Sequence, residues 1–508
     1  MRSAARFVAL TAVFFLGTTF AHAASEPKAP APSEARRTIA VVPFVSSANA
    51  EYRWVGAGVA HALVSQLLEV KELNTLTVRQ LNAAVRNDNL NPDELNDDKN
   101  IDHLAVQTGA DYCVIGSYTA EWPEVTIIAR LYNASTKKTE KSYFASGTLE
   151  DFFALEQQIA KGIGETLSVK IDTSTAAIGT KNLYAFHQAM MGYDLLNWQS
   201  MSPRAQLTLP SGSVKKARLH FEKATKLDAK YADAFAGLGM SQAFGGEPDN
   251  ARKSFAQAQQ LAPGGFAPQA VLGKYYTDLH SGRTDDALKA LDAGQKLRPG
   301  FLHAVGYLGE TYNHMGRYRE ALATFERYHK LSPKQPWVMV QIGYTKAKLK
   351  RFDDAIADTK TAVAMLPDSV SFQTELASRY IDADKLSDAE QVLQKSLDKY
   401  PKNAKVYLRL GYVYLLQQKT DQAIPVLQRA LQEAQLAEEG RTRSYAHFDL
   451  ARAFAIKKNN KDALGHLDEA VKNGYRDLDS LENDPDLSEV RKDPHYQDIM
   501  ALAKKPSV

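Results

Sequence analysis

The stretch LHAVGYLGETYNHMGRYREALATFERYHKLSP, residues 302–333, decides the fold of most of the chain. Its apolar spacing predicts two amphipathic helices joined by a short turn, with Gly309 in the first and Ala321 in the second. Small residues at facing positions let two antiparallel helices approach closely. Phe325 lies one turn after Ala321 on the same face, where it is suited to fill the layer between neighbouring helix pairs. Pro333 lacks an N–H and therefore ends the second helix.

The same pattern recurs along the carboxyl-terminal part of the chain. Alanines equivalent to Ala321 follow one another at spacings of 34, 36, 34, 34, 34, 34 and 40 residues. They are Ala217, Ala251, Ala287, Ala321, Ala355, Ala389, Ala423 and Ala463. Five of them are followed 12 residues later by a proline. A single helix pair cannot bury its apolar face alone, so this periodicity predicts a stack of pairs that share one core.

This pattern resembles the tetratricopeptide repeat (TPR) family. The resemblance implies a solenoid of about eight repeats over residues 182–473, followed by a capping segment at 474–508. We expect apolar residues of that segment to cover the last repeat, which a solenoid needs for solubility. These residues are Leu487, Val490, Tyr496 and Ile499.

Three departures from the repeat pattern are visible. The first repeat carries an insertion of 13 residues within 199–213. Tyr275 replaces the small residue of the third repeat, and Thr359 replaces the large residue of the fifth. We expect looser packing at the third and fifth repeats.

The preceding residues have the pattern of a mixed α/β module. Residues 38–45 (TIAVVPFV) form a continuous apolar run, which is typical of a strand buried on both faces. An amphipathic helix is predicted at 56–70, and a helix ending at Gly109 precedes three strands at 111–119, 125–132 and 139–146. A further amphipathic helix is predicted at 149–167, beyond the last strand.

The order of these segments resembles the TolB amino-terminal-type domain. The resemblance rests on IAVVPF (39–44), VGAGVAHALVSQL (55–67), TGADYCVIGSYT (108–119) and VTIIARLYNASTKKTEK (125–141). It implies a protein-binding or assembly module and no reaction. The predicted fold class is therefore α+β multidomain: a small α/β domain at 37–170, a linker at 171–181, and then the all-α TPR solenoid.

The first residues have the three-part pattern of a secretory signal. Arg2 and Arg6 precede the uncharged run at 7–20, and Ala21-His22-Ala23 supplies small residues at the cleavage site. As a helix that run spans about 21 Å, which is short of the roughly 30 Å hydrocarbon core. We expect cleavage after Ala23, a flexible Pro/Ala-rich leader at 24–36, and no integral membrane segment in the mature protein. Together with the family resemblance, this predicts a periplasmic location.

Charge and cysteine content exclude several classes of function. The net charge is +3, and removing Arg2 and Arg6 from the 62 basic residues leaves 60 against 59 acidic ones. This balance gives no strong attraction to nucleic acid. Cys113 is the only cysteine, which excludes a disulfide framework within the chain and a multi-cysteine metal site. Its place within a strand indicates a buried, inert thiol.

The TPR resemblance also implies where a partner binds, because the first helix of each repeat lines a groove in that family. Aromatic side chains interleaved with charged ones on this face suit an extended peptide or a partner's helix. The binding candidates are Trp337, Tyr344, Lys405, Leu408, Arg409, Tyr412, Phe448 and Arg452. We predict a non-enzymatic periplasmic scaffold or adaptor that binds protein partners of the envelope. Its oligomeric state is left open.

Three other hypotheses were compared with the scaffold. Lys405 and Arg409 match the last pair of the carboxylate clamp found in some TPR domains, but Glu375 would repel a carboxylate, so the clamp is rejected. A glycan or peptidoglycan binder is an alternative, because Trp337 and the groove tyrosines can stack on sugar rings.

An enzyme in the α/β domain is the third hypothesis. Its clustered polar residues fit no nucleophile–base pattern. They are His103, Asp111, Ser117 and Glu121. The histidines of the array do not have metal-ligand spacing. We therefore predict no catalytic residue, no metal and no cofactor.

Overall fold

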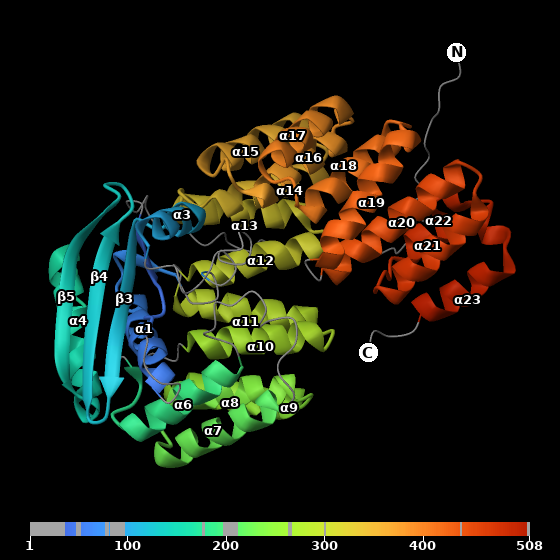
Figure 1. Ribbon diagram of the computed structural model, residues 1–508. Helices are drawn as coiled ribbons and strands as arrows, with labels where there is room; N and C mark the ends of the chain where they lie inside the picture. The colour runs from blue at the N-terminus through green and yellow to red at the C-terminus, as the bar shows by residue number, and fades with distance from the viewer. Residues whose placement is uncertain are drawn as a thin grey trace, which may run out of the picture. The chain divides into compact units, whose positions relative to one another are not determined.

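A computed structural model describes residues 36–46, 52–76, 81, 97–174, 178–196, 212–262, 267–298, 301–436 and 439–504. The predicted signal peptide, all but the last residue of the leader, and most of the insertion within 199–213 lie outside these ranges. The predicted fold class is confirmed: a small mixed five-stranded sheet is followed by a long array of helices (Figure 1).

The sheet has the strand order β2-β1-β3-β4-β5. Its strands are β1 (Arg37–Val41), β2 (Leu73–Thr75), β3 (Tyr112–Glu121), β4 (Glu124–Asn133) and β5 (Lys138–Thr148). β1 is parallel to both of its neighbours, whereas β3, β4 and β5 form an antiparallel meander joined by tight turns. The first strand is shorter than the run 38–45 predicts, and Val45 forms only an isolated bridge to Ser117.

Each face of the sheet has its own core. α1 (Arg53–Leu68) and α4 (Phe152–Leu167) cover one face, and α3 (Asp98–Thr108) covers part of the other. Cys113 lies in the second core with Ile115 and Tyr132. Burial raises the pKa of its thiol to about 12, so the thiol stays protonated and is inert, as its position in the strand predicts.

The described residues beyond the module form eight helix pairs, which we number as repeats one to eight. In chain order the pairs are α6 (Leu183–Leu195) with α7 (Ser213–Leu227), α8 (Ala232–Phe244) with α9 (Pro248–Leu261), α10 (Pro268–His280) with α11 (Thr284–Leu297), α12 (Leu302–His314) with α13 (Tyr318–Leu331), α14 (Pro336–Lys348) with α15 (Phe352–Met365), α16 (Val370–Asp382) with α17 (Leu386–Lys399), α18 (Ala404–Leu416) with α19 (Thr420–Leu436), and α20 (Gly440–Ile456) with α21 (Asn460–Lys472).

The helices of a pair meet where a small residue faces a large one, as the repeat pattern predicts. A Cβ atom added to Gly309 would lie 2.6 Å from the ring of Phe325, and one added to Gly239 would lie 2.6 Å from the ring of Phe255. Both rings are fully buried. A larger residue at either glycine would force these helices apart, and overpacking of this kind costs about 1–3 kcal/mol.

The expectation of looser packing in the fifth repeat is wrong. The side chain of Thr359 is completely buried against Gly343. Its hydroxyl donates a hydrogen bond of 2.8 Å to the carbonyl of Ala355 in the preceding turn. The smaller side chain is therefore accommodated by a closer approach of the two helices.

The capping segment closes the last repeat. It contains α22 (Leu478–Asn483), two short 3₁₀ turns at Pro485–Leu487 and Val490–Lys492, and α23 (Pro494–Ala503). The four apolar side chains expected to cover the array are all buried in one cluster with Leu467 of α21. They are Leu487, Val490, Tyr496 and Ile499.

The module core holds a buried polar pair between α1 and α4. Gln66 donates a hydrogen bond of 3.0 Å to Oε2 of Glu156, and both side chains are fully buried. Burial raises the pKa of Glu156 to about 8, and the hydrogen bond from Gln66 only partly opposes this shift. The carboxyl group is therefore protonated in the folded protein at neutral pH, whereas in the unfolded chain it ionises near pH 4.3.

This difference predicts a pH-dependent stability. A raised folded-state pKa gives stability that is complete below about pH 4.3 and is lost as the pH rises towards 8. We expect Glu156→Gln to remove this loss, so the variant should gain stability relative to the wild type between pH 5 and 8. Urea unfolding followed by circular dichroism across this range measures the difference. Glu165→Gln, an exposed site on the same helix, is the matched control, and a Glu156→Gln effect that does not vary with pH would contradict the assignment.

Candidate functional site: the inner face of the repeats

The inner face is the surface formed by the first helices of the repeats: α6, α8, α10, α12, α14, α16, α18 and α20. Equivalent positions can be compared between repeats. Tyr193, Tyr344 and Tyr412 each follow the small glycine of their repeat, so they occupy the same place on the inner face. Their surroundings differ, and this difference shows which part of the face is open.

In the first repeat and at the start of α8, the inner face is covered by α1 of the chain's own α/β module. Tyr193 is completely buried, with the ring of His61 stacked on it at 5.8 Å between centroids. His61 Nε2 lies 2.8 Å from Oδ2 of Asp233, at the start of α8. Phe186 of α6 packs edge-on against Phe153 of α4, with centroids 5.3 Å apart.

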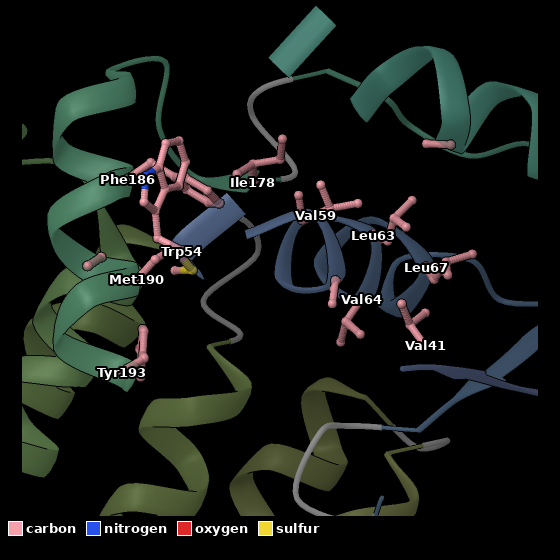
Figure 2. Close-up of a cluster of buried hydrophobic side chains, with 14 of the residues drawn as sticks. Val41, Trp54, Val59, Leu63, Val64, Leu67, Ile178, Phe186, Met190 and Tyr193 are labelled. Carbon is pink, nitrogen blue, oxygen red and sulfur yellow. The ribbon is translucent and has the colours of Figure 1, made fainter. Parts of the chain in front are cut away.

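These contacts belong to one continuous core. A single cluster of buried side chains includes β1, α1 and α4 of the module and the first helices of the array. Figure 2 shows part of it, with Val59 and Leu63 on α1, and Phe186 and Met190 on α6. Ile178 from the predicted linker 171–181 is buried in the same cluster. The described part of this linker therefore belongs to the fold rather than separating two independent domains.

The module also contacts the third, fourth and fifth repeats. Arg298, which follows α11, donates a hydrogen bond of 2.7 Å to the carbonyl of Leu68 and forms an ion pair with Glu69. Lys334, just before α14, lies 2.5 Å from a carboxylate oxygen of Asp111.

Gly109 lies at the closest approach of module and array. It has the left-handed backbone angle expected of a helix cap, with φ of 63°. A Cβ atom there would lie 2.6 Å from the carbonyl oxygen of Lys334, so only glycine fits.

Two of the candidate binding residues are mainly packed inside the array. The Trp337 ring is half-buried and lies edge-on to Phe325 and Tyr328, at 6.0 and 5.6 Å between centroids. Phe448 is 5% exposed and stacks on Tyr475 of the capping segment at 4.3 Å. Both side chains therefore contribute to packing within the array and its cap.

Arg452 joins the last repeat to the capping segment. Its guanidinium group lies 3.0 Å from Asp484, 2.9 Å from Asp486 and 3.4 Å from Asp449. Burial raises the pKa of Asp449 to about 6, and the charge of Arg452 only partly opposes this shift. With three carboxylates around it, Arg452 is engaged within the chain.

Tyr344 lies beneath two cations. The Arg379 guanidinium is 5.3 Å from the ring centroid, and the Lys348 ammonium is 5.4 Å from it. Arg379 is 6% exposed and lies 3.1 Å from Asp382. The sequence pattern did not single out Arg379, because an arginine on an amphipathic helix is usually exposed.

The remaining four candidates form a continuous strip on α18, which we call the α18 strip: Lys405, Leu408, Arg409 and Tyr412. The Lys405 side chain is 68% exposed and lies 3.9 Å from Glu439. The other three are half-buried. No ion pair or hydrogen bond of the Arg409 side chain to another described residue is found within bonding distance. The strip therefore offers charged donors and an aliphatic side chain, together with the half-buried Tyr412 ring, over which the Arg452 guanidinium lies at 5.8 Å from the centroid.

A histidine pair in the last repeat was not predicted. His447 Nδ1 lies 2.9 Å from His466 Nδ1, on the facing helices α20 and α21. Burial, and then the charge of His466, lower the pKa of His447 to about 4, so both rings are neutral at pH 7. Among the described residues, no group of three or more His, Cys, Asp or Glu side chains is arranged to hold a metal ion.

Two residues of the enzyme hypothesis, Asp111 and Ser117, have contacts within the fold. Asp111 accepts a hydrogen bond of 2.7 Å from the backbone N–H of Thr38 and pairs with Lys334 of the array. Ser117 lies within β3, where it pairs with Ile128 of β4. Within the described ranges, no helix is both long and apolar enough to cross a bilayer.

Comparison with known families identifies the class of the array. Sequence models of the tetratricopeptide repeat match residues 278–336 and 380–442. Together with the helix pairs, these matches confirm that the chain contains TPR repeats, a class of protein fold that generally serves as a protein-interaction scaffold. No curated protein matches the chain.

Three solved structures illustrate the similarity. A tetratricopeptide repeat protein from Parabacteroides merdae is 13% identical, covers 54% of this chain and 99% of its own, and has a TM-score of 0.42. The TPR protein TTC0263 of Thermus thermophilus is 25% identical over 39% of this chain and 99% of its own, with a TM-score of 0.31. PilF of Pseudomonas aeruginosa is 16% identical over 42% of this chain and 94% of its own, with a TM-score of 0.33. These similarities say nothing about what the present chain binds.

The contact between α1 and the inner face predicts energetic coupling across the module boundary. We expect His61→Ala and Asp233→Ala each to destabilise the protein by about 1–3 kcal/mol, because each leaves a mostly buried partner without its hydrogen bond. The double variant should lose less stability than the two single variants together, with a coupling free energy of at least about 0.5 kcal/mol. Urea unfolding of the four proteins measures this cycle. Additive losses, or separate unfolding transitions for the module and the first repeats, would contradict the shared core.

Proposed function

We propose that this protein is a secreted, non-enzymatic scaffold of the bacterial periplasm, and that the α18 strip is its principal docking surface for a protein partner. The observation that carries the proposal is the set of partly exposed basic and apolar side chains on one face of α18. Arg409 forms no ion pair within 4 Å among the described residues, although its charge acts on Asp449, and Leu408 and Tyr412 extend the same strip along the helix. Arginine and tyrosine are enriched among the residues that dominate binding energy at protein interfaces.

The first repeat supports a polypeptide as the occupant. There, the tyrosine equivalent to Tyr412 is completely buried beneath a helix, and an inner-face aspartate bonds to that helix through a side chain. The inner face of this chain thus already binds one helix, its own α1. A partner segment on the α18 strip would use an equivalent position in the seventh repeat.

The periplasmic location and the role of the module belong to the same proposal. The basic, apolar and small-residue segments at 1–23 support export, and the resemblance of 37–170 to the TolB amino-terminal-type domain supports a second, assembly role for the module. The partner surface of the module would then be one that the array leaves uncovered, since α1 and Gly109 are already engaged by the repeats.

The docking surface is tested by reversing its charge. We expect Lys405→Glu with Arg409→Glu to reduce crosslinked partner recovered from the periplasm by at least about tenfold, since hot-spot losses exceed about 2 kcal/mol. Quantitative mass spectrometry of the captured proteins measures the loss. The matched control is Lys395→Glu with Lys461→Glu, two exposed lysines on second helices.

Both double variants should melt within a few degrees of the wild type. Equal recovery by the strip variant and the control variant would refute the α18 strip as the docking surface. Retention of the wild type, but not the strip variant, on purified cell wall would favour the glycan-binding alternative instead.

Export is tested separately. Expressed with its first residues in a Gram-negative host, the full chain should appear in the periplasmic fraction with Ala24 as its first residue, as read by mass spectrometry of the intact protein. Ala23→Arg should block cleavage, because the cleavage site requires a small residue. Ala31→Arg, within the leader, is the control. Recovery of the wild type from the cytosol with residues 1–23 attached would contradict the proposal.

A further inference from the structure

A pocket of about 560 Å³ lies between the second and third repeats, within the range of roughly 300–1,000 Å³ typical of ligand sites. Its walls come from the carboxyl-terminal half of α8, the start of α9 and the middle of α10. The side chains that line it are mainly aromatic or apolar: Met240, Ala243, Phe244, Phe255 and Tyr276.

The third repeat lacks a side chain at one inner-face position that lines the pocket. Gly273 occupies the place that Tyr307, Gln341, Glu375, Arg409 and Asp449 occupy in the five following repeats. A Cβ atom on Gly273 would lie 2.5 Å from the ring of Phe255. The glycine therefore lets the Phe255 ring lie directly against α10, and both residues line the pocket. The expectation of loose packing in the third repeat rested on Tyr275, which is outside this lining; it is buried and stacks on Tyr307 of the next repeat at 5.4 Å.

The hydroxyl groups of Thr277 and Ser281 in the lining are already bonded to the backbone, and that of Tyr276 is the third. Thr277 Oγ1 donates a hydrogen bond of 2.8 Å to the carbonyl of Gly273, and Ser281 Oγ donates one of 2.7 Å to the carbonyl of Thr277. These donors are used within α10. The pocket consequently presents carbon and the thioether of Met240 to an occupant, together with aromatic edges. Aromatic rings and methionine sulfur both make favourable contacts with a further aromatic ring.

The pocket continues a surface that already binds polypeptide. On α8, Asp233 at the first turn bonds to His61 of α1, whereas Met240 and Phe244 at the later turns line the pocket. Phe244 is 56% exposed at the rim. An exposed aromatic side chain beside a cavity is a feature of protein interfaces, and a small ligand inside the cavity would leave much of this ring in water.

We infer that this pocket is a second docking site, which accepts an aromatic side chain from a protein partner. The inference rests on the proposed function only in taking a protein as the occupant. The test uses small molecules that carry the aromatic side chain alone. Its result therefore does not depend on whether the α18 strip binds a partner.

The test measures binding of N-acetyl-L-phenylalaninamide to the full chain by saturation-transfer NMR, with N-acetyl-L-alaninamide as the probe without a ring. We expect a saturable signal for the first probe only. Ala243→Trp, which places an indole at the half-buried lining position, should weaken this binding at least about tenfold. Ala357→Trp, at an exposed position of α15, is the matched control and should bind as the wild type does.

Phe244→Ala provides a second variant that does not alter a buried residue, and it should weaken binding several-fold. The inference is overturned if Ala243→Trp binds the phenylalanine probe as well as the control does. It is also overturned if the alanine probe competes equally, or if N-acetyl-L-leucinamide binds more tightly than the aromatic probe. Circular dichroism and melting curves establish that each variant is folded before binding is compared.

Discussion

The close contact between a small residue on one helix and a large side chain on its partner is the interaction on which the array depends. Phe325 against Gly309 and Phe255 against Gly239 set how near the two helices of a pair can lie. Their rings are completely buried, so each also belongs to the core between neighbouring pairs. Thr359 shows that this position does not require a large side chain. In the fifth repeat the smaller threonine is packed directly against Gly343 of the facing helix.

A second constraint follows from the position of α1. By covering the inner face of the first repeat and the start of α8, α1 makes the module and the array parts of one core. Arg298 and Lys334 extend this attachment along the following repeats. The function of the array is consequently divided: part of the inner face holds the chain's own module, and the later repeats retain the strip that a partner can reach. The inner face thus binds the chain's own module and, in our proposal, a partner protein as well.

Charged groups on the inner face have different roles that depend on their partners. Arg452 is surrounded by three carboxylates and ties the capping segment to the last repeat, whereas Arg409 has no such partner among the described residues. A buried arginine without a carboxylate would be costly, and a half-buried one can still reach a ligand. Between the second and third repeats, the inner face offers a mainly apolar cavity instead of a charge.

The sequence by itself determined the repeats, the small residues at which helices meet, the meander of the module and the apolar cap. These features depend on local periodicity and on residue size, which a single chain displays directly. Only the tertiary structure decided which inner-face residues a binding partner can reach. The pattern marked Phe448 and Tyr412 as candidates in the same way, yet Phe448 stacks on Tyr475 of the cap, whereas Tyr412 stays partly exposed beside the Arg452 guanidinium. An apolar pattern shows that a residue is suited to burial but not which surface covers it. The contact of α1 with α6 joins segments far apart in the chain, and no local spacing records such a pairing.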